Sequence, residues 1–167
     1  GCMVISIPEM TEGQACTALI GLDALEQESS IELGPITFGA CDNGALYDQE
    51  AFERLLHDSD VDVIVWGVRG HANAVRRPNM FGWIDADEHG LIHHISVKSP
   101  LSRPDVDPIV LGAFTFRSAA DFRRSVERMY ERDGRINDEF YIDEAINDAI
   151  ALGLKCHLFQ VDHFLAW

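Results

Sequence analysis

The sequence predicts an α/β fold in which a mixed, mostly parallel sheet is flanked by helices. In the first half of the chain, short apolar segments typical of buried strands alternate with segments whose apolar residues recur at helical spacing. In the second half, two strand-like segments are joined by a short turn that contains glycine. The chain has no repeat, linker or low-complexity segment, so residues 1–167 are expected to form a single domain.

The expected elements of the first half begin with a short strand that stops at Pro8. Apolar residues between Ala15 and Leu25 then follow helical spacing, and a later apolar strand runs into the turn-forming residues Asp-Asn-Gly after Cys41. Strands are expected at residues 4–7, 35–41 and 61–68, and helices at residues 15–25 and 48–57.

A predicted hairpin opens the second half, with its turn at residues 88–90. Ser118 is a suitable N-cap for one of the helices that follow, and Gly153 is a suitable C-cap for the next. Strands are expected at residues 81–85, 91–98, 109–116 and 154–161, and helices at residues 118–129 and 143–152.

The composition excludes several classes of partner. A formal net charge of -15 disfavours nucleic acids and anionic membrane surfaces, because both repel an acidic protein. No stretch of apolar residues approaches the ~20 that a transmembrane helix needs. The start of the sequence lacks the pattern of a signal peptide, and the four cysteines show neither clustering nor CxxC spacing. A reduced, cytoplasmic protein is therefore expected.

Two charged residues lie where chemistry is expected, because ligands of open α/β sheets collect beyond the carboxyl ends of the strands. Asp42 follows an apolar strand and could hold a divalent cation over phosphate groups, but a turn that merely ends the strand is the alternative. Lys98 ends another apolar strand and could bind a phosphate, with a surface lysine as the alternative.

Other candidates are weaker on their own. Gly13 precedes a predicted helix, where a flat base or a phosphate could approach the backbone, although a plain turn explains it equally well. His93 and His94 are adjacent on a predicted strand and are expected to point to opposite faces, which favours a surface hairpin over a metal site.

In combination, several segments resemble the sugar nucleotidyltransferase family, the nucleotidyltransferase domain of sugar-nucleotide pyrophosphorylases. Residues 11–17 resemble the segment that places a glycine, here Gly13, against the nucleotide base. Residues 41–43 resemble the motif in which the aspartate, here Asp42, binds the catalytic magnesium and the next residue, Asn43, lies near the sugar.

The later segments follow in the order of the same family. Residues 97–100 resemble the motif whose lysine, here Lys98, holds the sugar phosphate. The resemblance implies that Gly82, Gly112 and Glu139 also bind substrate, within segments at 81–83, 111–114 and 138–142. Residues 163–167 resemble the approach to the family's Gly-Thr-Pro motif.

The sequence departs from the family at three points. The family begins with a strand and a Gly-rich loop whose Arg and Lys clamp the triphosphate, and nothing here corresponds to that loop. The chain is therefore expected to start inside a Rossmann-like domain and to form its larger, C-terminal part. Val97 stands where the family has a glutamate that contacts a sugar hydroxyl, and the second metal-binding aspartate would fall on Ala166.

The resemblance implies a nucleotidyltransferase that forms a nucleotide sugar and pyrophosphate from a nucleoside triphosphate and a sugar 1-phosphate, with Mg²⁺ as cofactor, for surface polysaccharide synthesis. A non-catalytic nucleotide-sugar-binding or assembly module of the same fold is the alternative. A glycosyltransferase would need an Asp-x-Asp metal motif, and the two matches by letter, at 85–87 and 105–107, do not follow parallel strands. The sugar, the base and the oligomeric state stay open.

Overall fold

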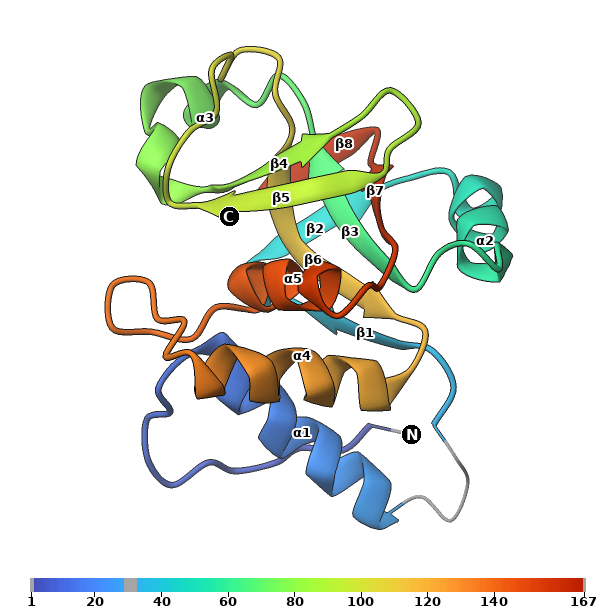
Figure 1. The fold of residues 1–167 in the computed structure, drawn as a ribbon, viewed down its shortest axis with the longest axis vertical. Coiled ribbons are helices and arrows are strands. Elements are labelled where there is room, and N and C mark those ends of the chain that lie inside the picture. Colours follow the sequence, from blue (N-terminus) through green and yellow to red (C-terminus); the bar gives the residue numbers. More distant parts are fainter. Residues whose placement is uncertain (1, 29–32, 167) are drawn as a thin grey trace.

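A six-stranded sheet lies at the centre of the structure, a computed structural model that describes residues 2–28 and 33–166 (Figure 1). Its strands are β1 (Ile36–Gly39), β3 (Val63–Val68), β4 (Gly82–Ala86), β5 (Ile92–Val97), β6 (Ile109–Phe116) and β7 (Cys156–Gln160). A second, two-stranded antiparallel sheet pairs β2 (Asn43–Leu46) with β8 (His163–Ala166). Trp167, the last residue of the segment 163–167 discussed above, lies outside the described residues.

The strand order is β5-β4-β6-β3-β7, and β1 also pairs with β6. One edge of β6 pairs with β3, whereas the other edge is divided between two strands. β4 pairs with the start of β6 at Ile109, and β1 pairs with its end, from Ala113 to Phe116. β4 and β1 therefore separate beside residues 110–112 of β6.

The prediction that the sheet is mostly parallel is wrong. The sheet is mixed, but among the described strands only β3 and β7 pair in parallel, and every other pair is antiparallel. A parallel pair needs a long crossover connection, usually a helix. β4 and β5 are joined by a tight turn instead, and residues 98–108 lead to β6 without a helix. β6 is antiparallel to all three of its partners, β1, β3 and β4. The prediction took the alternation of strands and helices in the first half as evidence for parallel neighbours, whereas β1 and β3 both pair with β6.

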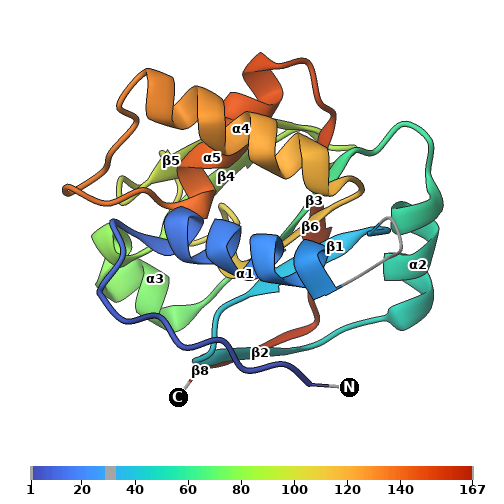
Figure 2. The same cartoon turned by 90° about the horizontal axis from the view of Figure 1, so that it is seen from below.

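Helices cover one face of this sheet. α1 (Gln14–Glu28), α4 (Ala119–Glu131) and α5 (Ile142–Ala151) pack on it, while the β2–β8 sheet lies on the opposite side (Figure 2). α2 (Gln49–His57) packs with the residues of that opposite side, and the short α3 (Ala72–Arg76) and 3₁₀ helix η1 (Pro78–Met80) follow β3. Within the described residues, every helix is too short or too polar to cross a bilayer.

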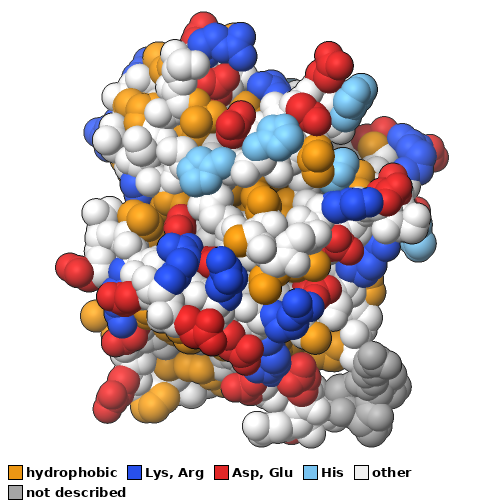
Figure 3. Space-filling model, viewed as in Figure 1, with side chains coloured by type: hydrophobic (Ala, Val, Ile, Leu, Met, Phe, Trp, Pro, Cys, Tyr) orange, Lys and Arg blue, Asp and Glu red, His pale blue; other side chains and the backbone are white. Residues whose placement is uncertain are grey.

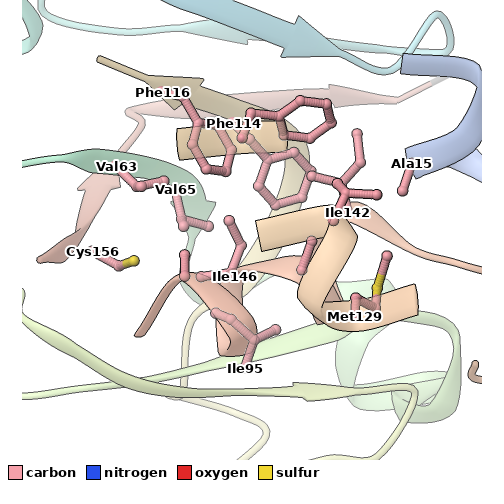
Figure 4. Close-up of a cluster of buried hydrophobic side chains, with 14 of the residues drawn as sticks. Ala15, Val63, Val65, Ile95, Phe114, Phe116, Met129, Ile142, Ile146 and Cys156 are labelled. Atoms are coloured by element: carbon pink, nitrogen blue, oxygen red, sulfur yellow. The ribbon is translucent and has the colours of Figure 1, made fainter. Parts of the chain in front are cut away.

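The larger hydrophobic core lies between the sheet and the three helices. Phe114 and Phe116 of β6 are buried against Ile142 and Ile146 of α5, together with Met129 of α4 (Figure 4). Alternate residues of a strand point to opposite faces, which explains why Trp66 and Trp83 belong to a second core on the other side.

An ion pair between the exposed Arg132, at the end of α4, and the buried Asp148 links α4 to α5 beside this core. The Asp148 side chain is 2% exposed, and its carboxylate accepts hydrogen bonds from Nε (2.8 Å) and Nη2 (2.6 Å) of Arg132. This bidentate geometry is the strong form of a charged hydrogen bond. On the face seen in Figure 1, acidic and basic side chains are intermixed, and histidines gather over β5 (Figure 3). His93 and His94 of β5 are both exposed.

Most of the predicted elements are confirmed to within a few residues, including the hairpin and the Ser118 cap, whose side chain accepts a hydrogen bond from the N–H of Ala120. The strand predicted at residues 4–7 is wrong. Val4 is 90% exposed, and no described strand pairs with this segment, so its strand propensity has no ladder to join.

A close backbone contact joins the loop before α1 to the loop before α5. The N–H of Phe140 donates to the carbonyl of Glu12 (2.9 Å), and the N–H of Ala15 donates to the carbonyl of Phe140 (3.0 Å). Gly13 lies between these bonds with φ +137, and a Cβ there would meet the backbone O and N of Phe140 at 2.5 and 2.6 Å. This position therefore requires glycine.

We predict that Gly13→Ala lowers the free energy of unfolding by more than about 2 kcal/mol, because the new methyl group meets backbone and the φ angle suits glycine. Gly21→Ala is the matched control, since Gly21 lies within α1 with nothing within 4 Å of its Cβ position. That change is expected to stabilise by up to about 1 kcal/mol. Chemical denaturation of both variants measures this, and similar effects of the two changes would contradict the prediction.

Candidate functional site

Two adjoining cavities open where β4 and β1 separate along β6. Their volumes are about 560 Å³ and about 360 Å³, within the range of small-molecule sites. Gln14, Ala40, Asp42 and Gly112 line both cavities, so the two meet at the end of β1. The division of the β6 edge between two strands thus creates the site.

The larger cavity is mainly apolar. α1 contributes Thr17 and Ala18, and the sheet contributes Phe38 and Phe114. Such a lining suits the flat, weakly polar surface of a ring rather than a phosphate group.

The smaller cavity is more polar and contains charged side chains. Those that line it include Lys98 and Asp143, together with Asn43, His71 and Tyr141. His71 packs edge-on against Phe81 and Phe164, and its burial lowers the pKa of the imidazole below its ordinary value. This ring is therefore neutral at physiological pH.

Asp42 and Asn43 follow β1 at the junction of the cavities. Asp42 is exposed in the turn, while the Nδ2 of Asn43 donates to the carbonyl of Leu111 (2.9 Å). The N–H of Ala40 donates to the carbonyl of Gly112 (2.9 Å), so both carbonyls at the split in the sheet have partners. Gly112 has φ +90, and a Cβ there would lie 3.2 Å from the Nδ2 of Asn43. Glycine at 112 thus allows Asn43 to approach β6.

Lys98 is held at the end of β5. Its Nζ donates to the carbonyl of Met80 (2.7 Å) and lies 5.3 Å from the centre of the Tyr141 ring. Its backbone has φ 57, a left-handed conformation uncommon for residues other than glycine. The ammonium group keeps donor capacity beyond the one bond to Met80 and is fixed beside the cavity.

Asp143 lies in the first turn of α5, against the backbone of β4. A Cβ at Gly82 would fall on the carboxylate, within 3.2 Å of its Cγ, so only glycine at 82 leaves room for Asp143. Burial of the carboxylate raises the pKa of Asp143 to about 6, although the positive charge of Lys98 acts in the opposite direction. The carboxylate and the ammonium group are thus neighbours in one cavity.

The structure brings five of the seven predicted site residues together. Asp42, Lys98, Asn43, Gly82 and Gly112 all line the smaller cavity. Gly13 and Glu139 line neither cavity.

These last two residues adjoin residues that do line the site. Gly13 precedes Gln14, which lines both cavities. The carboxylate of Glu139 lies beside the hydroxyl of Tyr141 and raises the pKa of that hydroxyl to about 12. Glu139 can therefore influence the smaller cavity through Tyr141.

Sequence reasoning missed Gln14, His71, Tyr141 and Asp143. Gln14 and Tyr141 lie inside two of the segments that carry the family resemblance, so their positions offered a signal. His71 lies in a loop that no prediction covered, and Asp143 resembled an ordinary acidic residue in the first turn of a helix.

The described residues contain no group of three or more His, Cys, Asp or Glu side chains that could hold a metal ion. Asp42 offers a single carboxylate at the junction of the cavities. This arrangement fits magnesium, which is commonly bound through one or two carboxylates while phosphate oxygens and waters complete its shell.

Comparison with known proteins identifies the fold. No model of a protein family matches the sequence, and no curated protein matches it. Among solved structures, the nucleoside-diphosphate-sugar pyrophosphorylase from Vibrio cholerae RC9 matches with a TM-score of 0.73 and 18% identity, over 96% of this chain and 62% of that one. The inositol-1-phosphate CTP transferase from T. maritima matches with a TM-score of 0.54 and 9% identity, over 89% of this chain and 54% of that one.

These likenesses confirm the predicted resemblance at the level of the fold. The chain has the α/β fold of these two proteins, with a mixed sheet flanked by helices. It spans less than two thirds of the length of either.

We predict that Asp143→Asn raises the stability of the protein most at neutral and higher pH. The pKa of Asp143 lies above its ordinary value of 3.8, so the folded state binds its proton more tightly than the unfolded state. Stability is therefore lost as the pH rises from about 4 to about 6, and asparagine avoids that loss.

Thermal unfolding at about pH 7.5 and about pH 4.5 measures the effect. The melting temperature of Asp143→Asn is expected to exceed that of the unsubstituted protein at the higher pH, with a smaller difference at the lower pH. Asp138→Asn is the control, because Asp138 is exposed in a loop outside the cavities and its positive φ suits asparagine. An equal gain for Asp143→Asn at both pH values would show that ionisation of Asp143 is not the cause.

Proposed function

We propose that this chain is the sugar-phosphate-binding part of a nucleotidyltransferase, which forms a nucleotide sugar and pyrophosphate from a nucleoside triphosphate and a sugar 1-phosphate. The reaction is an attack of a sugar-phosphate oxygen on the α-phosphorus of the triphosphate. We propose that this reaction takes place in the cytoplasm, in the synthesis of surface polysaccharides.

One observation carries the proposal. In a chain with a net charge of -15, Lys98 is fixed in the same cavity that Asp42 lines, at the split in the sheet. An acidic protein that binds an anionic substrate needs local positive charge, and a Lys ammonium is a compact partner for a phosphate. The fold likeness to a pyrophosphorylase and a CTP transferase, both named for phosphate-bearing substrates, supports the same chemistry.

The proposed roles follow from the lining of the cavities. The phosphate of the sugar lies beside Lys98, and the sugar lies against Asn43, Gly82 and Gly112. The base enters the apolar cavity beside Gln14, next to Gly13, and Glu139 acts on the sugar side through Tyr141. Asp42 holds a magnesium ion, which, when bound, neutralises negative charge on the phosphates. Catalysis then depends on positioning and on this charge neutralisation.

The second candidate function is a non-catalytic module that binds nucleotide sugars. It is favoured by the single carboxylate, that of Asp42, at the proposed metal position. Both candidates require ligand binding in the same cavities. They differ in turnover, which a pyrophosphate-release assay of this chain with nucleoside triphosphates and sugar 1-phosphates measures.

A ligand scan tests the shared part of the proposal. Thermal unfolding is followed with nucleotide sugars, sugar 1-phosphates and nucleoside triphosphates, each with and without Mg²⁺, because a ligand that binds the folded state raises the melting temperature. Lys98→Ala is expected to weaken binding of sugar 1-phosphates by at least about tenfold. Asp42→Ala is expected to remove the dependence on Mg²⁺ and any turnover.

Lys155→Ala is the matched control, since Lys155 is an exposed lysine that lines neither cavity. It is expected to keep the affinity of the unsubstituted protein. If no phosphate-bearing ligand stabilises the protein, or if Lys98→Ala and Lys155→Ala behave alike, the proposed site is wrong.

A further inference from the structure

The smaller cavity is lined by the carboxylate of Asp143 and the ammonium group of Lys98. The carboxylate packs on β4, in the space that a Cβ at Gly82 would need, and the Nζ of Lys98 is anchored on the carbonyl of Met80. The carboxylate therefore lies in the same cavity as the group that would receive a phosphate. The roles proposed above leave Asp143 without a function.

The charges around Asp143 disfavour a doubly charged phosphate. Within the cavity, Lys98 is opposed by two carboxylates, Asp143 and Asp42, while His71 is neutral. The groups nearest on its own helix and loop are also acidic. Glu144 is engaged by Arg132, and Glu139 lies beside Tyr141.

A phosphate that binds to Lys98 thus meets a fixed carboxylate. Two negative groups that share one site do not both stay ionised, and one of them takes up a proton. Asp143 is the group prepared to do so, because burial already raises its pKa to about 6. Once protonated, a carboxyl group becomes a hydrogen-bond donor.

The position of Asp143 in its helix acts in the opposite direction. It lies in the first turn of α5, where Tyr141 is the N-cap residue and forms no side-chain capping bond. The free N–H groups and the dipole of a helix N-terminus favour an anion, and this includes the ionised carboxylate of Asp143 itself. Protonation of Asp143 therefore depends on its burial and on the negative charge of the ligand that binds beside Lys98.

We propose that Asp143 is a specificity-determining residue of this cavity, which takes up one proton from solvent when a phosphate monoester binds beside Lys98 and donates a hydrogen bond to a phosphate oxygen. No covalent bond to the ligand is formed or broken. The inference rests on the proposed function, because it assumes that the cavity binds a phosphate. Binding of the phosphate monoester is therefore expected to weaken as the pH rises, because Asp143 loses its proton.

Calorimetric titration with glucose 1-phosphate, without divalent cations, tests this inference between about pH 5.5 and about pH 8. For the unsubstituted protein, Kd is expected to rise by about tenfold per pH unit above the pKa of Asp143, as the uptake of one proton requires. Titration in two buffers of different ionisation enthalpy is expected to report uptake of about one proton per ligand near pH 7. In Asp143→Asn, this proton uptake is expected to vanish, and the affinity at about pH 8 is expected to match that of the unsubstituted protein near pH 6.

Three controls isolate Asp143. The phosphate itself titrates with a pKa of about 6, so inorganic sulfate, which stays a dianion over this range, is titrated as a second probe. His71→Gln and Asp138→Asn are expected to keep the pH dependence, since one removes the neighbouring imidazole and the other removes a carboxylate outside the cavity.

The outcomes separate this inference from the proposed function. If the unsubstituted protein binds glucose 1-phosphate and Asp143→Asn retains the same pH dependence and proton uptake, the inference is wrong while the proposed function stands. Weaker binding by Asp143→Asn at every pH would also overturn it, because the ionised carboxylate would then be the binding form. If neither protein binds glucose 1-phosphate or sulfate at any pH, both proposals are wrong.

Discussion

The division of one edge of β6 between two strands is the constraint on which the rest of the site depends. β4 and β1 both pair with this edge, at its start and its end, and they leave residues 110–112 beside a gap in the sheet. The side chain of Asn43 in β2 and the backbone of Ala40 fill part of this gap, through the bonds that they donate to the carbonyls of β6. The remaining space forms the two cavities. A continuous ladder along this edge would leave no opening at this place.

Electrostatics gives the smaller cavity a character that differs from that of the whole chain. Most acidic side chains face solvent or pair with arginines, as Glu144 and Asp148 do with Arg132. Lys98 and Asp143 instead share a partly enclosed space, where the positive charge of Lys98 lowers the pKa of the Asp143 carboxyl against the larger, opposite effect of burial. Because Asp143 can take up a proton while Lys98 keeps its charge, the net charge of the cavity can change when a ligand binds. An arginine at position 98 would lack the compact charge that this arrangement uses.

Much of the fold follows from local patterns, and the exceptions have identifiable causes. Helix periodicity, the Ser118 cap and the turn of the β4–β5 hairpin are local properties, and the structure contains all of them. The direction and pairing of a strand are set by partners far along the chain. The predictions of a mostly parallel sheet and of a strand at residues 4–7 were wrong for this reason. Asp42 and Lys98 could be predicted because each lies at or just beyond the end of an apolar strand. Asp143 could not, because its contact with Gly82 joins segments that are distant in the sequence and carry no shared pattern.

The β2–β8 sheet determines when the binding cavities can form during synthesis of the chain. It pairs Asn43, at the edge of the cavities, with residue 166, and the contact between Gly13 and Phe140 also joins distant parts of the chain. Closing such long loops costs entropy before the contacts they bring can form. During synthesis, α4 and the strands before it can emerge from the ribosome while Asn43 still lacks its partner in β8. The binding cavities are therefore completed only after translation has passed β8, and a chain stalled earlier would present an open, apolar gap to chaperones rather than a site to a substrate.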